Sequence, residues 1–253
     1  MDIGKSFTYV FDDEQWVQKV VIGALLLLAS IIPIVNIFTA LVVVGYALRV
    51  LKNVSDGIER PLPDWDNWGE DWIKGLLFVL GMLIYALPAI LVGGMAAIIM
   101  TITTAGKSGE PSSGAQLCIF GLQCLTWIWG LLVALWQPAV MIRFAREGRF
   151  AAMFEFGALW SLIRAHAGDY IIAIIITFVA QFLSMFGVIL CVIGVFLTAF
   201  WALLVEAHIY GQVGAPAAPA AMGGEGDFLG PTTYGEWTEA PPSTPEEEPK
   251  GEE

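Results

Sequence analysis

The sequence has few charged residues, and long parts of it have none. Asp, Glu, Lys and Arg make up 14% of the 253 residues, against roughly a quarter in a typical soluble domain. Four stretches contain no charged residue at all: 20–48, 75–106, 111–142 and 170–205. An uncharged apolar run of about twenty residues is long enough to cross the hydrocarbon core of a bilayer. The composition therefore argues against a soluble domain, and we expect an integral membrane protein.

Residues that bind metals or act as nucleophiles are also scarce. The chain has two histidines, His166 and His208, and three cysteines, Cys118, Cys124 and Cys191, all three within apolar runs. The cysteine spacing fits neither a disulfide framework nor a metal-ligand pair, so we expect small core residues. For the histidines we expect capping or interfacial hydrogen bonds. We expect no cofactor, since no nucleophile–His–acid set and no phosphate-binding glycine loop occurs in the sequence.

The central part of each apolar run has no ionisable side chain. Ion-coupled transporters and enzymes that work within the bilayer depend on such groups, which are costly in lipid and are kept for function. The polar residues that remain in the central spans, apart from Ser and Thr, are Asn36, Gln123, Gln137 and Gln181. We expect them to form hydrogen bonds between helices. The lack of ionisable side chains within the runs favours a protein that is not an enzyme.

The apolar runs divide into about six transmembrane helices in three hairpins, 16–51, 72–146 and 169–210, within a membrane domain at 16–211. Pro33 lies in the middle of the first run, and proline disrupts a helix interior but suits the first turn of a new helix. The second hairpin is divided by a loop rich in Ser, Gly and Thr, and the third hairpin by a break near Gly187. A five-span alternative, with the first run as one helix, stays open.

The positions of the basic residues predict an orientation. With six spans, ten of the twelve Lys and Arg fall near span ends on the side of the N-terminus. Basic residues in short loops mark the cytoplasmic side of a membrane. We therefore expect a multi-pass protein of the cell (cytoplasmic) membrane with both termini in the cytoplasm, where residues 1–15 form an interfacial segment.

The last part of the sequence has a different composition. Residues 212–253 are rich in Pro, Ala, Gly and Glu, and from Val213 onward they hold nine acids against one lysine. Such a segment buries too little apolar surface to offset the entropy lost on ordering. We expect a disordered acidic tail.

An unusual segment, 56–72, separates the first two apolar runs with six acids and three tryptophans in DGIERPLPDWDNWGEDW. Trp65, Trp68 and Trp72 are spaced i, i+3, i+7, which places them on one face of a short helix. Tryptophan prefers the headgroup region, so we expect an amphipathic in-plane helix capped by Asp64. The expected basic partners of its acids are Arg49, Lys52 and Arg60.

The same segment matches a calcium-binding loop only in part. Asp64, Asp66 and Gly69 stand at positions 1, 3 and 6 of such a loop, but Trp68 and Gly75 occupy positions 5 and 12, where ligands are required. We therefore expect no metal site.

A longer pattern surrounds this segment: an aromatic–Arg helix exit, an acidic-Gly turn, a PLP-x-W core and a following Y-x-x-P. The residues that carry it are Tyr46, Arg49, Asp56, Gly57, Pro61, Leu62, Pro63, Trp65, Tyr85 and Pro88, with Trp68 and Trp72 beside them. In this pattern the chain resembles the DUF4013 family of prokaryotic membrane proteins, from the N-terminus to about residue 210. The family has no established activity, so the resemblance implies a membrane protein and transfers no catalytic residue.

Three interpretations of function follow. The first is a non-catalytic scaffold that binds a membrane or cytoplasmic protein through its interfacial helices and acidic tail. The second is a transporter or lipid-handling protein with an apolar groove between hairpins. The third is an enzyme at the cytoplasmic surface that would act through Asp64, Asp66, Glu70 or Glu155. The lack of charge in the spans favours the first, with the lipid bilayer as surroundings and no nucleic-acid partner.

Overall fold

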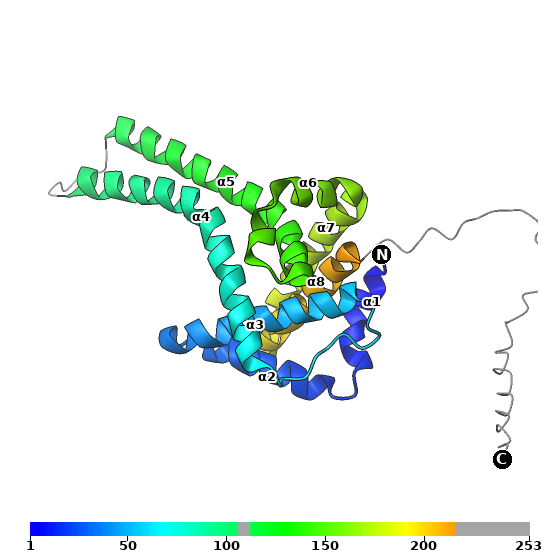
Figure 1. Cartoon of the computed structure of the whole chain (residues 1–253). Coiled ribbons are helices and arrows are strands. Elements are labelled where there is room, and N and C mark those ends of the chain that lie inside the picture. Colours follow the sequence, from blue (N-terminus) through cyan, green and yellow to red (C-terminus); the bar gives the residue numbers. More distant parts are fainter. Residues whose placement is uncertain (106–111, 216–253) are drawn as a thin grey trace, which may run out of the picture. The chain divides into compact units, whose positions relative to one another are not determined.

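The computed structural model describes residues 1–105 and 112–215, except for the side chains of residues 190–193. The predicted acidic tail from residue 216 on and the loop around Lys107 lie outside the described residues. The described part is helical and contains no strand (Figure 1), which confirms the all-α prediction. The helices are α1 (Ile3–Thr8), α2 (Trp16–Ala29), α3 (Pro33–Ser55), α4 (Trp68–Thr104), α5 (Ser113–Glu147), α6 (Phe156–Ala165), α7 (Ala167–Ser184) and α8 (Cys191–Gly214), with 3-10 segments η1 (Tyr9–Asp12), η2 (Phe150–Phe154) and η3 (Met185–Leu190).

Five described helical segments are long and apolar enough to cross a membrane, so the chain is a multi-pass membrane protein. They are Pro33–Ser55, Trp68–Thr104, Ser113–Glu147, Ala167–Ile189 and Gly194–Gly214. The predicted pairing into three hairpins is confirmed, because α2 packs on α3, α4 on α5 and α7 on α8. Helix α2 corresponds to the first of the six predicted spans. It has 14 residues and is about 21 Å long, shorter than the bilayer core of about 30 Å.

The two predicted breaks within apolar runs have clear local causes. Pro33 takes the first turn of α3, where its missing N–H needs no helical partner. Gly187 lies in η3, between α7 and α8, and a Cβ atom there would lie 2.1 Å from the hydroxyl oxygen of Thr198. Only glycine therefore lets α8 fold back against this turn.

Helices α3 and α4 approach each other closely at two glycines. A Cβ atom on Gly45 would lie 1.8 Å from the backbone oxygen of Asp71, and one on Gly75 would lie 1.9 Å from the backbone oxygen of Leu41. Small residues allow helix backbones to meet in this way in membranes. The two contacts fix how α4 lies along α3.

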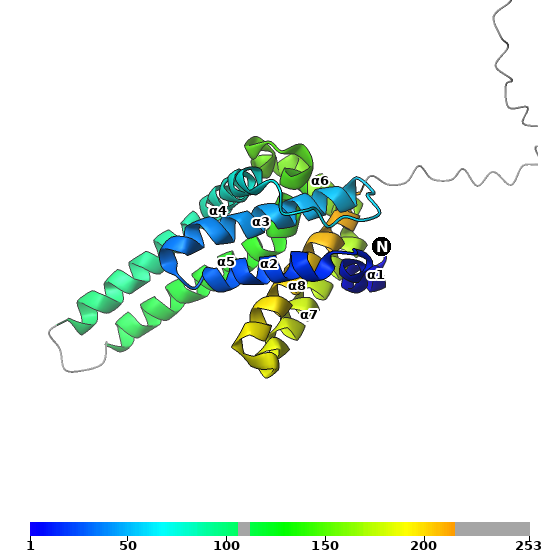
Figure 2. The same cartoon turned by 90° about the horizontal axis from the view of Figure 1, so that it is seen from below.

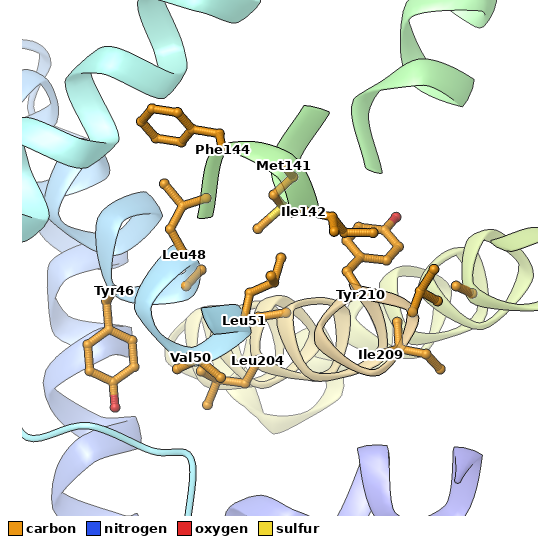
Figure 3. Packing of buried hydrophobic residues seen from close by; sticks show 14 of the residues in the cluster. Tyr46, Leu48, Val50, Leu51, Met141, Ile142, Phe144, Leu204, Ile209 and Tyr210 are labelled. Atoms are coloured by element: carbon orange, nitrogen blue, oxygen red, sulfur yellow. The ribbon is translucent and has the colours of Figure 1, made fainter. Parts of the chain in front are cut away.

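The largest apolar core forms where α3, α5 and α8 meet (Figure 3). Its fully buried members include Leu48 and Leu51 from α3, Ile142 from α5, and Leu204 and Ile209 from α8. Because lipid tails are as apolar as these side chains, close packing holds such a cluster together more than exclusion of water does.

The α4–α5 hairpin extends away from the other helices (Figures 1 and 2). Helix α4 has 37 residues, about 55 Å; it is bent rather than straight (Figure 1), and Pro88 lies inside it. Proline lacks an N–H and pushes away the preceding turn, and Trp129 of α5 donates its indole N–H to the backbone oxygen of Tyr85 at 2.8 Å. Cys118, in the outer half of this hairpin, is exposed, so its predicted place in a core is wrong.

The polar residues of the predicted spans differ in the hydrogen bonds that they form. Gln181 of α7 donates to Glu206 of α8 at 3.4 Å, as predicted, and Asn36 donates to the backbone oxygen of Ser30 at 2.9 Å. Gln123 forms no hydrogen bond with a described residue. Helix α8 continues past the uncharged run to Gly214, so Glu206, the residue that follows this run, lies within the last helix.

Replacing Gly45 by alanine tests the close contact of α3 and α4. We expect Gly45→Ala to lower the free energy of unfolding in detergent by about 1–3 kcal/mol, because the new methyl group meets backbone atoms that must move. The matched control is Gly94→Ala, since nothing lies within 4 Å of a Cβ atom at Gly94. Thermal unfolding followed by circular dichroism measures both, and equal melting temperatures would show that the helices are not in close contact.

Candidate functional site

The segment rich in acids and tryptophan is largely not a helix. Helix α3 ends at Ser55, Gly57 adopts a positive φ of 75°, and the chain then runs as an open loop until α4 begins at Trp68. The predicted in-plane helix is therefore wrong: Trp65 precedes α4, and Asn67 rather than Asp64 occupies the N-cap position. We call residues 61–67 the strap.

The backbone carbonyls of the strap are bound by side chains. Five consecutive carbonyl oxygens, those of residues 61–65, each accept a hydrogen bond from a different side chain. The pairs are Asn53 Nδ2 with Pro61 O (2.9 Å), Lys19 Nζ with Leu62 O (3.1 Å), Tyr46 Oη with Pro63 O (2.9 Å), Arg49 Nη2 with Asp64 O (2.8 Å) and Trp68 Nε1 with Trp65 O (2.6 Å).

The helical repeat of α3 explains why three of these donors lie together. Tyr46, Arg49 and Asn53 are spaced three and four residues apart, so they lie on one face of the helix. Pro61 and Pro63 favour an extended backbone and have no N–H to satisfy. The PLP sequence therefore presents carbonyl oxygens to the row of donors on α3. Because its two prolines have no backbone N–H, it needs few hydrogen-bond acceptors itself.

Aromatic packing of the Trp65 side chain also holds the strap in place. The ring of Trp65 stacks on that of Tyr46, with centroids 4.0 Å apart and planes 13° apart, and its indole N–H donates to the backbone oxygen of Lys19 at 3.0 Å. Phe200 of α8 lies 6.1 Å from the Trp65 ring. Figure 3 shows Tyr46 pointing out of the apolar core towards this loop.

Arg49 joins the strap to the start of α4. Its guanidinium group binds Asp66 of the strap and Asp71 of α4, each at 2.8 Å. The Asp71 side chain is only 1% exposed, so Arg49 supplies the charge that this buried carboxylate needs. The hydrogen bond from Arg49 also holds the pKa of Asp66 below its usual value.

Lys19 makes the corresponding connection to α2. Its ammonium group lies 2.7 Å from Asp13 and 3.0 Å from Asp64. Burial of the Asp13 carboxyl acts to raise its pKa, but hydrogen bonds from Lys19 and from the Gln15 N–H outweigh burial, and the pKa is lowered. The strap therefore contacts α2, α3 and α4 together.

Of the three expected basic partners, only Arg49 binds the acids of the segment. Arg60 instead pairs with Glu14 at 3.2 Å, and both side chains are exposed. Lys52 forms no ion pair with any described acid. Sequence reasoning also missed Lys19, Asn53 and Asp71, although a polar row on one face of an apolar helix is a signal that points to Asn53.

The remaining residues of the sequence pattern lie along α3 and α4. Asp56 and Gly57 form the turn that ends α3. Trp72 lies in α4 and its ring is stacked 6.5 Å from that of Phe38. Tyr85 and Pro88 lie further along α4, away from the strap, so the pattern marks one junction and one helix bend rather than a single cluster.

A second junction uses the same chemistry at the end of α5. Tyr85 donates its hydroxyl to the backbone oxygen of Met153 at 2.5 Å, much as Tyr46 binds the strap. Arg143 and Arg149 both form ion pairs with Glu155, which follows η2. Side-chain donors again hold an irregular segment to the neighbouring helices.

The acids considered for catalysis are each bound to basic residues. Asp64 pairs with Lys19, Asp66 with Arg49, and Glu70 with Lys74 at 2.6 Å, while Glu155 belongs to the second junction. Within residues 1–105 and 112–215, no group of three or more His, Cys, Asp and Glu could hold a metal ion. The geometry of the strap is that of a structural junction.

Of the two histidines, His208 is buried in α8. Its Nδ1 atom lies 2.9 Å from the hydroxyl of Ser6 and 3.0 Å from the amide nitrogen of Gln212. Its ring stacks on Tyr9 with centroids 4.2 Å apart. These contacts attach the N-terminal helix α1 to α8, which agrees with the predicted hydrogen-bonding role.

The chain was compared with known protein families, curated proteins and solved structures. The profile of a family described as "Protein of unknown function (DUF4013)" matches residues 28–197, more than half of the chain. This range includes the strap and α3 to α7. No curated protein and no solved structure matches the chain.

Replacing Arg49 tests the junction. We expect Arg49→Gln to reduce the free energy of unfolding in detergent by about 3–5 kcal/mol, because it leaves the buried Asp71 carboxylate unpaired. The control is Arg60→Gln, whose exposed ion pair contributes no more than about 1 kcal/mol. Chemical denaturation measures both variants. A similar, small change in the two would contradict the role given to Arg49.

Proposed function

The chain is a member of the DUF4013 family of proteins of unknown function, and from this premise we propose that it is a non-catalytic membrane scaffold. In this proposal the strap holds α2, α3 and α4 as one platform. The α4–α5 hairpin extends from that platform and binds a transmembrane helix of a partner protein.

A groove on α5 supports the proposal. It has a volume of about 440 Å³ and is lined by Gln123, Thr126, Trp127, Gly130, Leu131 and Ala134. These positions recur every three or four residues, so they form one face of the helix. The lining residues lie in the middle of α5, and the hairpin that α5 forms with α4 extends away from the other helices (Figure 2).

The chemistry of the groove suits another helix better than lipid. Gly130 and Ala134 are small residues four positions apart, the spacing that lets two transmembrane helices approach closely. Gln123 is exposed and bonds to no described residue, and an unpaired amide group is costly in hydrocarbon. A partner helix with a polar side chain would satisfy Gln123 through an interhelical hydrogen bond. This exposed glutamine is the observation that carries the proposal.

We further propose that the strap side of the protein faces the cytoplasm and that the membrane is the cell membrane. The support is the placement of ten of the twelve basic residues near that side, as the positive-inside rule requires. Both described ends of the chain, α1 and the end of α8, lie on the strap side.

A second candidate, lipid handling or transport, rests on a different pocket. Its volume is about 260 Å³ and its lining is almost entirely apolar and aromatic, formed by Tyr85, Trp129, Leu132, Val133, Trp136 and Phe156. It lies beside the bend of α4. An acyl chain or another apolar solute fits such a lining, but no Asp, Glu, Lys, Arg or His lines it.

Photo-crosslinking distinguishes the two candidates. A benzophenone amino acid in place of Leu131 is irradiated in native membranes, and adducts are identified by mass spectrometry. We expect one discrete protein adduct, reduced roughly three- to tenfold by Gln123→Leu, because an interhelical hydrogen bond contributes about 0.6–1.4 kcal/mol.

Two controls accompany this experiment. Gln116→Leu removes a glutamine near the start of α5, outside the groove, and should leave the adduct unchanged. The same crosslinker in place of Phe178, an exposed residue of α7, should give lipid adducts. Lipid adducts alone at position 131, as at position 178, would overturn the scaffold proposal, because they would show that the groove faces lipid and not a partner helix.

A further inference from the structure

A small pocket lies where the ends of α3 and α5 meet the start of α4. Its volume is about 80 Å³. Four basic residues line it together with the apolar side chains of Leu48 and Phe144. The basic residues are Arg49, Lys52, Lys74 and Arg146, and Glu147 is the one acid.

Two of these four cations already have partners on the protein. Arg49 is bound by Asp66 and Asp71, and Lys74 is bound by Glu70.

The acid of the lining is also engaged. Glu147 forms ion pairs with Arg143 and Arg149. Lys52 and Arg146 form no ion pair with any acid in the described part of the chain. The pocket therefore carries two positive charges that the described protein does not balance.

The position of the two cations at helix ends explains only part of this arrangement. Lys52 and Arg146 lie in the last turns of α3 and α5, where a positive charge is favourable near the free carbonyl groups. That effect accounts for a cation on each helix separately. It does not bring both cations to the lining of one pocket.

We propose that this pocket binds the phosphate group of an anionic phospholipid. Phosphate oxygens accept charge-assisted hydrogen bonds from lysine and arginine, and the apolar membrane-length helices that carry these cations suit the acyl chains of a lipid. The pocket lies at the ends of membrane-length helices, on the side rich in basic residues. Basic pockets between transmembrane helices on the cytoplasmic side suit anionic head groups. The site is separate from the α5 groove and does not depend on the scaffold function.

Native mass spectrometry of the full chain tests the site. The protein is purified in detergent with equal amounts of phosphatidylglycerol and phosphatidylcholine that carry the same acyl chains. We expect one phosphatidylglycerol to be retained with about tenfold preference over phosphatidylcholine, since each nearby cation adds appreciably to binding of an anionic lipid. The preference should disappear in Lys52→Gln/Arg146→Gln.

The controls separate the pocket from general charge. Lys5→Gln/Arg164→Gln removes the same charge outside the pocket and should keep the preference. Lys52→Arg/Arg146→Lys preserves the charge and should keep it too, and circular dichroism of Lys52→Gln/Arg146→Gln shows whether that variant keeps the helical fold. A preference that survives Lys52→Gln/Arg146→Gln, or that is absent from the unchanged chain, would overturn the proposal.

Addition of excess inorganic phosphate distinguishes the two sources of a phosphate group. We expect the bound lipid to remain, because its acyl chains also pack on the apolar membrane-length helices, which inorganic phosphate cannot do. Displacement of the lipid by inorganic phosphate would assign the pocket to a soluble phosphate compound and overturn the lipid assignment.

Discussion

Backbone carbonyl groups without helical partners are the main constraint on this structure. Backbone carbonyl groups that are buried away from water need hydrogen-bond partners within the protein. Here the strap, residues 61–67, leaves five consecutive carbonyls outside any helix, and side chains from α2, α3 and α4 bind all five. Tyr46 and Arg49 contribute twice, since Tyr46 also stacks on Trp65 and Arg49 also neutralises Asp71.

The position of the other features depends on this junction. The strap sets where α4 begins, and the contacts of Gly45 and Gly75 set how it lies against α3. The start of α4 and its contacts with α3 together set the direction in which the α4–α5 hairpin extends. Arg49 belongs both to the junction and to the basic pocket, so the same residue that orders the strap also shapes the candidate lipid site.

The sequence predicts the fold class and the helix pairs well, because long apolar runs and proline at a helix start have direct physical meanings. It fails at the strap. The i, i+3, i+7 spacing of its tryptophans is typical of a helix, but Pro61 and Pro63 and the donors on α3 favour an open chain. It also misses Lys19 as a partner of the strap, since Lys19 and Asp64 are 45 residues apart in the sequence. Contacts of that kind depend on how helices pack, which spacing within one segment does not report.

Cysteine labelling of the strap tests its attachment most directly. In a chain with Cys118, Cys124 and Cys191 replaced by alanine, Leu62→Cys places a thiol at a position that is 4% exposed. We predict slow reaction with a water-soluble maleimide, compared with rapid reaction of Glu59→Cys, which lies in the exposed turn. Adding Arg49→Gln should make position 62 react rapidly. Equal rates at positions 59 and 62 in the chain with Arg49 intact would contradict the view that the strap is bound to the helices.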